Sequence, residues 1–412
     1  MGARAAAVTR VNNPWLEKQI QREGMELGFL DGRAEGLSRL EQVYNEQINK
    51  GLNQYITEFF NAFRELANNP ESLASRTLVR EAAISMTNDF KRVTDQLESI
   101  QLDLDGQIRT LVEEVNQISK EIAQLNEKIL QVENQGNVAN DERDRRDLLV
   151  KKLAEKIDIT YAESKDGQLN VTAGNSAVLV SGNSYNSLEA KLTGDRNRVE
   201  IFFRATESGT PFNLTQQFKG GRIGGILDVR DKVIEEFRRR VNETAFTLAK
   251  EVNTIHSVGY DRHGNTGNLF FSELNGAEGA AEKIKITNEI YHDVGRISVA
   301  ARPDAPGDNT IANMISAIQH RKIMSNGEAT IDDFYSTQVG QIGTFTQRAV
   351  KAQESQRNII SQLNNLRESI SGVSLDEEAT KMIEFQKAYD ASARLIRVAD
   401  EMLDTVLSLK RL

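Results

Sequence analysis

Cysteine is missing from this chain of 412 residues, which excludes disulfides, thiolate metal sites and cysteine nucleophiles. Proline (5 residues) and aromatic residues (6%) are scarce, and this favours a helix-rich protein over an aromatic-centred β-sandwich. No apolar run reaches the ~18 residues that a membrane-spanning helix needs. Residues 1–7 contain too few consecutive apolar residues for a signal-peptide core. Export of this chain, if it occurs, is therefore expected to use another route.

A strongly basic surface is also lacking, because the net charge is −9. A general nucleic-acid binder needs clustered cations to displace counterions from phosphates. A protein held on anionic lipids needs a polybasic segment. The composition therefore argues against nucleic-acid and membrane-surface partners.

Helical periodicity dominates the first third of the chain. Leucine and isoleucine recur at three- to four-residue spacings or small multiples of them between residues 14 and 44, which predicts a helix there. Gly24, Gly28, Gly32 and Gly36 are spaced four apart along it, and each glycine inside a helix costs about 1 kcal/mol relative to alanine. They indicate either close approach of another backbone or a deliberately weak helix.

Two further helices are predicted before residue 135. The first runs from about Leu52 to the stop at Asn68-Asn69-Pro70. The second covers about 71–135 and carries an apolar stripe with one stutter at Leu104 and Ile108, around Gly106. The stripe fits a long rod or an ordinary bundle helix, and both make this segment structural.

The pattern changes after a charged helix at 141–156. Short runs rich in β-branched and aromatic residues, separated by turn residues, predict a small antiparallel β-domain between Ile157 and about Phe218. Helix is expected to resume after Gly224-Gly225. The stretch 259–310 is rich in loops, with a possible strand at 283–286.

The last two predicted helices cover about 332–370 and 375–409. In the first, an unbroken three-four alternation places Phe345 on the apolar stripe, and the stripe continues to Ile370. In the second, the stripe is widened by residues one heptad apart, so it is expected to meet more than one neighbour. We predict that an assembly interface lies on this last helix, formed by Met382, Phe385, Tyr389, Leu395, Ile396, Met402, Leu403, Val406 and Leu409.

A search for catalytic constellations gives no candidate. The histidines, which are His256, His263, His292 and His320, form no zinc-type pair and accompany no nucleophile signature. Each is better explained as a solvated or hydrogen-bonded side chain. We therefore expect no enzyme activity, no cofactor and no bound metal.

Two loops resemble ligand-binding motifs only in part. Gly220-Gly221-Arg222-Ile223-Gly224-Gly225 lacks the lysine and hydroxyl of a phosphate-binding loop, so a turn into the next helix is the better explanation. The loop after Tyr260 offers one carboxylate, Asp261, and no bidentate glutamate at its end, so the EF-hand pattern fails. Tight turns at Gly264 and Gly267 account for this loop.

Four segments resemble the FlgK family of flagellar hook-associated proteins, in the expected order along nearly the whole chain. They are Leu66-Ala67-Asn68-Asn69-Pro70-Glu71-Ser72; Asp141-Glu142-Arg143-Asp144-Arg145-Arg146-Asp147-Leu148-Leu149-Val150; Gly224-Gly225-Ile226-Leu227-Asp228-Val229-Arg230-Asp231 with Asn253-Thr254-Ile255-His256-Ser257-Val258-Gly259-Tyr260-Asp261 and Leu269-Phe270-Phe271; and Ser371-Gly372-Val373-Ser374-Leu375-Asp376-Glu377-Glu378 with Phe385-Gln386-Lys387-Ala388-Tyr389 and Ala399-Asp400-Glu401-Met402-Leu403-Asp404-Thr405. The third is the most specific to the family, whereas the fourth is similar to several flagellar axial proteins.

The resemblance implies a non-enzymatic structural subunit that adapts the hook to the filament. It implies an extracellular place in the bacterial flagellum, reached through the type III export apparatus without a cleaved signal. Implied partners are copies of the chain itself, hook protein, the second hook–filament junction protein, and an export chaperone on the C-terminal helix. The amphipathic start typical of the family is not found, so we interpret the chain as an N-terminally truncated form. The alternatives are another axial protein, hook- or flagellin-like, and a secreted helical coiled-coil adhesin.

We therefore predict an α+β protein, an elongated coiled-coil-like helical bundle with an inserted antiparallel β-domain. Its expected parts are 1–156 as the N-terminal helical body, 157–222 as a β-rich outer domain, 223–258 as a returning helix, 259–310 as a loop-rich segment, 311–374 as further helical body, and 375–412 as a C-terminal assembly helix. The outer domain is expected to have a hydrophobic core of its own.

Overall fold

The computed structural model describes residues 10, 13–44, 50–194, 197–204, 209–372 and 375–409. It confirms the α+β class, because long helices are combined with two small antiparallel sheets. The chain divides into two compact units, one of residues Gln21–Arg357 and the other of Met1–Ile20 with Asn358–Leu412. None of the helices in the described ranges combines the length and the hydropathy that a membrane span needs.

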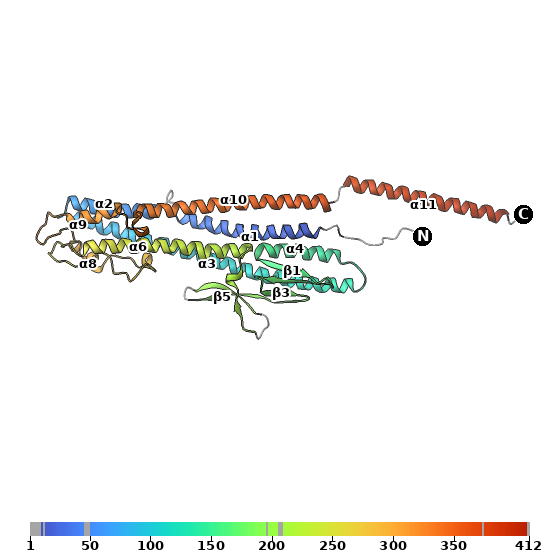
Figure 1. Ribbon diagram of the computed structural model, residues 1–412, viewed down its shortest axis with the longest axis horizontal. Helices are drawn as coiled ribbons and strands as arrows, with labels where there is room; N and C mark the ends of the chain where they lie inside the picture. Colours follow the sequence, from blue (N-terminus) through green and yellow to red (C-terminus); the bar gives the residue numbers. More distant parts are fainter. Residues whose placement is uncertain are drawn as a thin grey trace. The chain divides into compact units, whose positions relative to one another are not determined.

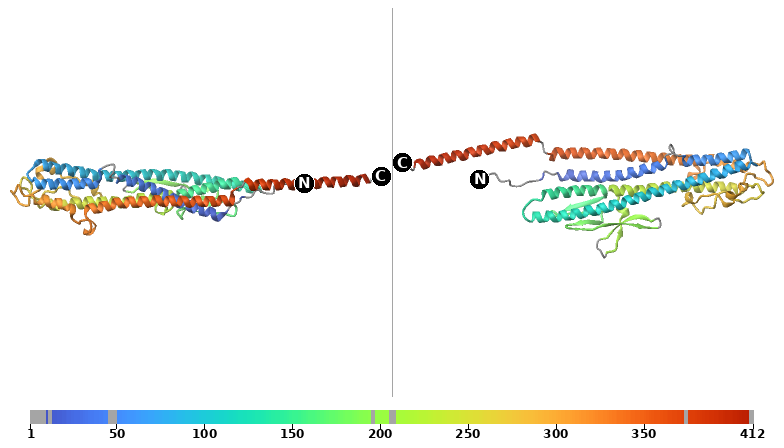
Figure 2. Two further views of the ribbon diagram at one scale, coloured as in Figure 1. Left: turned by 90° about the horizontal axis from the view of Figure 1, so that it is seen from above. Right: turned by 180° about the vertical axis from the view of Figure 1, so that it is seen from behind.

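The long helices lie close to where the periodicity predicts them (Figures 1 and 2). They are α1 (Pro14–Val43), α2 (Leu52–Asn68), α3 (Leu73–Glu133), α4 (Asn140–Lys156), α5 (Gly221–Asp228), α6 (Ile234–His256), α7 (Ala280–Lys283), α8 (Asn288–His292), α9 (Thr310–Ala317), α10 (Ile331–Ser371) and α11 (Leu375–Leu409). The 61 residues of α3 make a rod about 90 Å long, against which α2, α4 and α6 pack. The break expected between α1 and α2 lies mostly outside the described residues.

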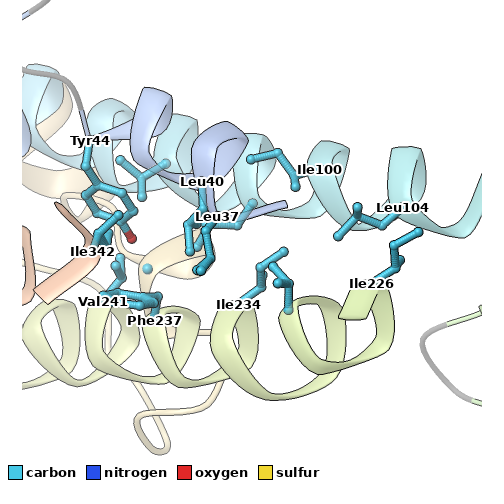
Figure 3. Close-up of a cluster of buried hydrophobic side chains, with 14 of the residues drawn as sticks. Leu37, Leu40, Tyr44, Ile100, Leu104, Ile226, Ile234, Phe237, Val241 and Ile342 are labelled. Carbon is cyan, nitrogen blue, oxygen red and sulfur yellow. The ribbon is translucent and has the colours of Figure 1, made fainter. Parts of the chain in front are cut away.

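The hydrophobic centre of the larger unit joins helices that are far apart in the sequence (Figure 3). Leu37 and Leu40 of α1, and Tyr44 just after it, meet Phe237 and Val241 of α6 there. Ile100 and Leu104 of α3, Ile226 of α5, Ile234 of α6 and Ile342 of α10 complete the labelled cluster. Each of these five helices therefore contributes apolar residues from one face to the same core, as their three-four spacing requires.

Two glycines of α1, Gly28 and Gly32, have another backbone against them. A Cβ at Gly28 would stand 2.0 Å from the carbonyl oxygen of Glu155, and one at Gly32 would stand 2.6 Å from that of Arg222. Gly225 of α5 lies equally close to the backbone of α1, because a Cβ added there would stand 2.0 Å from the carbonyl oxygen of Phe29. Of the two explanations predicted for these glycines, close approach of a backbone is confirmed for Gly28 and Gly32, whereas a Cβ at Gly24 would make only an ordinary side-chain contact.

Helix begins earlier after the sheets than the sequence indicates. Gly221, with φ +65°, opens α5, so Gly224 and Gly225 lie inside the helix and do not precede it. Residues Val229–Val233 form one π-helical turn, labelled η2, before α6. That turn directs Arg230 inward, where the Nη1 atom donates to Asp105 Oδ1 of α3 at 2.6 Å.

The strands form two antiparallel sheets with the orders β1-β2-β3-β4 and β5-β6-β7. Their bounds are β1 (Ile159–Glu163), β2 (Leu169–Ala173), β3 (Ala177–Ser181), β4 (Ser184–Tyr185), β5 (Leu188–Thr193), β6 (Arg198–Phe203) and β7 (Phe212–Asn213). A bulge between Val171 and Thr172 shifts the pairing of β2 with β3. In β5–β6 the register runs from Leu188 opposite Phe203 to Thr193 opposite Arg198.

The expected separate core of the β-domain is not found. Buried strand residues such as Val171, Leu179 and Ile201 belong to the same continuous hydrophobic cluster as the residues of α3 and α6. Polar side chains of α3 also bind the strands directly. Asn116 accepts from the Leu188 amide at 2.8 Å and donates to the Leu188 carbonyl at 2.9 Å, as a neighbouring strand would. The sheets therefore use α3 as one of their faces.

The loop-rich stretch after α6 contains short helices and isolated bridges. The strand predicted at 283–286 is wrong, because Lys283 ends α7 and only Ile286 pairs, in a single bridge with Phe271. Ile284 and Ile286 are nevertheless buried, which is why the alternation of their side chains resembles a strand.

The buried face of α10 differs from the predicted one by a small rotation. Phe345 is exposed at 38%, and Thr346 next to it is buried. Ile342, Ala349 and Gln356 share the buried face with Thr346. A polar residue replaces an aromatic one here because the Thr346 hydroxyl donates to the carbonyls of Ile342 and Leu37, at 3.1 and 3.4 Å.

Candidate assembly surface

Helix α11 leaves the predicted assembly residues in solvent. The exposed fraction is 74% for Phe385 and 72% for Leu395. The other described members of the set are also more than half exposed, and these are Met382, Tyr389, Ile396, Met402, Leu403 and Val406. The side chain of Leu409 lies outside the part that the structure describes. The described side chains of α11 thus expose an apolar stripe.

The local sequence explains why α11 is helical although this stripe is exposed. Asp376, Glu377 and Glu378 occupy its first turn, where carboxylates interact favourably with the helix dipole. Lys381 Nζ pairs with Glu378 Oε1 at 3.0 Å, one turn along the helix. Between them and Leu409, the helix contains neither proline nor glycine. The stripe covers about half of the helical circumference at 100° per residue, more than one partner helix normally buries.

The polar residues between Asn253 and Gly267 hold the loops after α6 in place. Asn253 Oδ1 accepts from the amides of Phe270 and Phe271, at 3.0 and 2.8 Å, and its Nδ2 donates to the Phe271 carbonyl at 2.9 Å. Asp261 Oδ1 accepts from the amides of His263 and Asn265, both at 2.8 Å. The carboxylate is thus used in a turn, in agreement with the failed EF-hand pattern. Gly264 and Gly267 have φ of +75° and +84°, as tight turns require.

His256 is the one predicted hydrogen-bonded histidine that is fully buried. Its Nδ1 lies 2.8 Å from the Asn268 carbonyl, so this nitrogen carries the proton, and Nε2 accepts from the Ser298 amide at 2.8 Å. Both ring nitrogens are thereby satisfied only in the neutral form. Burial lowers the pKa of His256 to about 4.

This burial predicts an acid-sensitive fold. The pKa in the unfolded chain is about 6.5, so the unfolded state binds the proton first, and stability falls as pH drops from about 6.5 to 4. The loss reaches about 3 kcal/mol at pH 4. The free energy of unfolding in urea should be measured at pH 7 and at pH 4 for the wild type and for His256→Gln. The other titrating groups are the same in both proteins, so the difference between their pH dependences isolates the contribution of His256. A wild-type pH dependence in His256→Gln would contradict the assignment.

A cleft of about 360 Å³ lies beside the same loops. Arg76, Arg262 and Arg302 line it, but so do carboxylates including Asp261 and Asp308. The Arg76 guanidinium already binds backbone groups, because its Nη1 and Nη2 donate to the carbonyls of Ile297 and Pro70, at 2.5 and 3.0 Å. Among the described residues no group of three histidine, aspartate or glutamate side chains has the arrangement of a metal site. The cleft thus brings together no acid, base and nucleophile in reacting positions.

Comparison with known proteins gives consistent matches. A model described as "Flagellar hook-associated protein FlgK helical domain" matches residues 37–271, and one described as "Flagellar basal body rod FlgEFG protein C-terminal" matches residues 367–409. The chain is 30% identical to flagellar hook-associated protein 1 of Bacillus subtilis over 440 aligned positions, which cover 99% of this chain and 86% of the relative. It is 22% identical to the protein of the same name from Escherichia coli, covering 99% and 90%.

A solved structure shares the fold. The flagellar hook junction protein FlgK from Burkholderia pseudomallei superposes with a TM-score of 0.78 at 14% sequence identity. The superposition covers 86% of this chain and 100% of the other.

Proposed function

Because the chain belongs to the family of the flagellar hook-associated protein FlgK, we propose that it is a subunit of the junction between hook and filament, held there by the apolar stripe of α11. Membership of this family makes it a structural protein of the flagellum and not an enzyme. It also sets aside the alternatives of a hook- or flagellin-like protein and of an adhesin, since the FlgK helical-domain model covers more than half of the chain.

The exposure of α11 carries the proposal. Each large apolar side chain left in water forgoes about 1.5–3 kcal/mol of burial, so a stripe of this size is stable in solution only at a considerable cost. Residues 367–409 match a model of the C-terminal part of flagellar basal body rod proteins, so this segment is similar to theirs. Both observations support assembly as the role of Met382, Phe385, Tyr389, Leu395, Ile396, Met402, Leu403, Val406 and Leu409.

The occupants of the stripe follow from this role. In the assembled flagellum they are other copies of the chain, hook protein and the second junction protein. Before assembly an export chaperone covers the helix, and the chain leaves the cell through the flagellar export apparatus. No cofactor takes part, and neither nucleic acid nor membrane is a partner.

Substituting aspartate for two residues of the stripe tests the proposal. Leu403 and Val406 are 59% and 64% exposed, so Leu403→Asp with Val406→Asp leaves the melting temperature of the isolated chain unchanged. The same double variant is expected to abolish incorporation at hook ends, seen by electron microscopy, and motility of the complemented cells. Two buried charges at an interface cost several kcal/mol each.

A matched control adds the same charge to the opposite face of α11. Gln386→Glu with Ser408→Asp is expected to assemble and swim normally. If it fails as completely as the stripe variant, charge and not apolar contact decides the outcome, and the assigned interface is wrong. A large fall in melting temperature for the stripe variant would place α11 in the folded core instead.

A further inference from the structure

Helix α10 is attached to the larger unit in two different ways along its length. From Ile331 to Ile342 three of the four buried side chains are large and apolar, namely Ile331, Tyr335 and Ile342. The fourth, Gln338, donates to the Phe237 carbonyl at 3.3 Å. From Thr346 onward the buried residues up to Arg357 are Thr346, Ala349 and Gln356. The hydrophobic contribution to attachment is therefore concentrated in the first part.

Hydrogen bonds to α1 replace apolar contact in the second part. Gln353 Nε2 and Arg357 Nη2 both donate to Asp31 Oδ1, at 2.5 and 3.0 Å. Gln356 Nε2 donates to the carbonyl oxygen and to the Oε2 atom of Glu23, at 3.1 and 2.5 Å. Water replaces such bonds at little net cost, so this polar seam, residues 346–357 of α10 against α1, separates more easily than the apolar part.

The boundary between the two parts is the weakest stretch of the helix. Gly340 faces open space, and a Cβ at Gly343 would meet only Glu41 Oε1, at an ordinary 3.7 Å. Unlike Gly28 in α1, neither glycine is required by packing, and each costs about 1 kcal/mol of helix stability. Thr344 Oγ1 donates to the Gly340 carbonyl at 2.9 Å, and Thr346 Oγ1 donates to that of Ile342 at 3.1 Å. Hydrogen bonds of this kind weaken and bend helices.

We propose that residues 343–345 are a hinge in α10, about which the polar seam opens from α1 and closes again while Ile331–Ile342 stays anchored. The Arg240 guanidinium, which donates to Gln341 Oε1 at 2.5 Å, is the last tie to α6 before the hinge. Because α11 follows the seam in the chain, opening at the hinge changes the course of the chain just before the assembly helix. This consequence alone rests on the proposed function.

The absence of native cysteine allows the hinge to be measured with paired spin labels on the full chain. Labels at Glu26→Cys and Ser355→Cys, both exposed, span the seam. Two distances, or one broad distribution, are expected with native glycines, and a single narrow distance is expected with Gly340→Ala and Gly343→Ala. Labels at Glu26→Cys and Lys152→Cys are the control pair, and they should give one narrow distance in both backgrounds.

Hydrogen exchange supplies a second readout that needs no label. Amides of residues 346–357 should exchange faster than those of 331–342, and the double alanine variant should slow them about tenfold, since it removes two helix-weakening glycines. Gly106→Ala, a replacement of another unpacked glycine in α3, should leave them unchanged. A single narrow distance across the seam with native glycines, or equal exchange on both sides of residue 343, would overturn the hinge. Either measurement uses the unassembled chain, so it stands or fails independently of the junction role.

Discussion

Replacing Gly28 by leucine is expected to destabilise the chain by about 3 kcal/mol or more, and replacing it by alanine is expected to cost less but still destabilise. The Cβ atom of the new side chain would stand 2.0 Å from the Glu155 carbonyl oxygen. The Cβ is bonded directly to one helix backbone and the oxygen is part of another, so neither atom can rotate away from the clash. Helices α1, α4 and α5 must therefore separate, and the contacts at Gly32 and Gly225 loosen with them. Urea unfolding followed by far-ultraviolet circular dichroism measures the change.

Gly24 provides a matched control in the same helix. A Cβ there would meet Glu155 Cγ at 3.7 Å, an ordinary contact, so Gly24→Ala should stabilise by up to about 1 kcal/mol through helix propensity. Gly28→Ala and Gly225→Ala together should cost less than the sum of the single changes, because the first already separates the helices. A Gly28→Ala chain more stable than the wild type would show that the helices do not need this close approach.

Replacing Asn126 by leucine is the second change with a large expected effect, a loss of about 3–5 kcal/mol. The side chain is fully buried, and its amide uses its whole bonding capacity. Nδ2 donates to the carbonyls of Leu169 and Gly182, at 2.8 and 2.7 Å. Oδ1 accepts from the Leu169 amide at 3.1 Å and from Arg146 Nη1 at 3.0 Å. Leucine would remove these four hydrogen bonds, and Arg146 Nη1 would keep only its bond to the Gly167 carbonyl, at 2.6 Å.

The loss is expected to begin in the sheet. Amides of residues 169–182 should exchange about a hundredfold faster in Asn126→Leu, before the helical signal changes. Asn88, exposed on the same helix, gives the control Asn88→Leu, which should behave as the wild type. An isolated segment of residues 157–222 should be unfolded, since α3 supplies part of its core and of its hydrogen bonds. Should that segment fold alone, the outer domain is autonomous and the role given to Asn126 is wrong.

The order of elements was predictable from the chain itself, because helix periodicity, proline stops and turn residues act over a few neighbours. This holds for α2 ending at Asn68, for α11 beginning at Leu375 and for the turns at Gly264 and Gly267. The apolar residues of α11 were predictable for the same reason, since a stripe too wide for one neighbour is visible in the spacing alone. The spacing of Gly28 and Gly32 was compatible with close packing and with a deliberately weak helix, and it could not name a partner.

Only the tertiary structure decided which polar residues are buried and what they hold. Asn126 and Asn116 look like ordinary surface residues of a long helix until strands more than forty positions away meet them. Thr346 replaces Phe345 on the buried face of α10 because a carbonyl of α1 lies within reach of its hydroxyl. Arg230 points inward because a π-helical turn rotates it toward Asp105. The free energy of burying a polar group depends on its partner, and a partner distant in the sequence leaves no local pattern by which to recognise it.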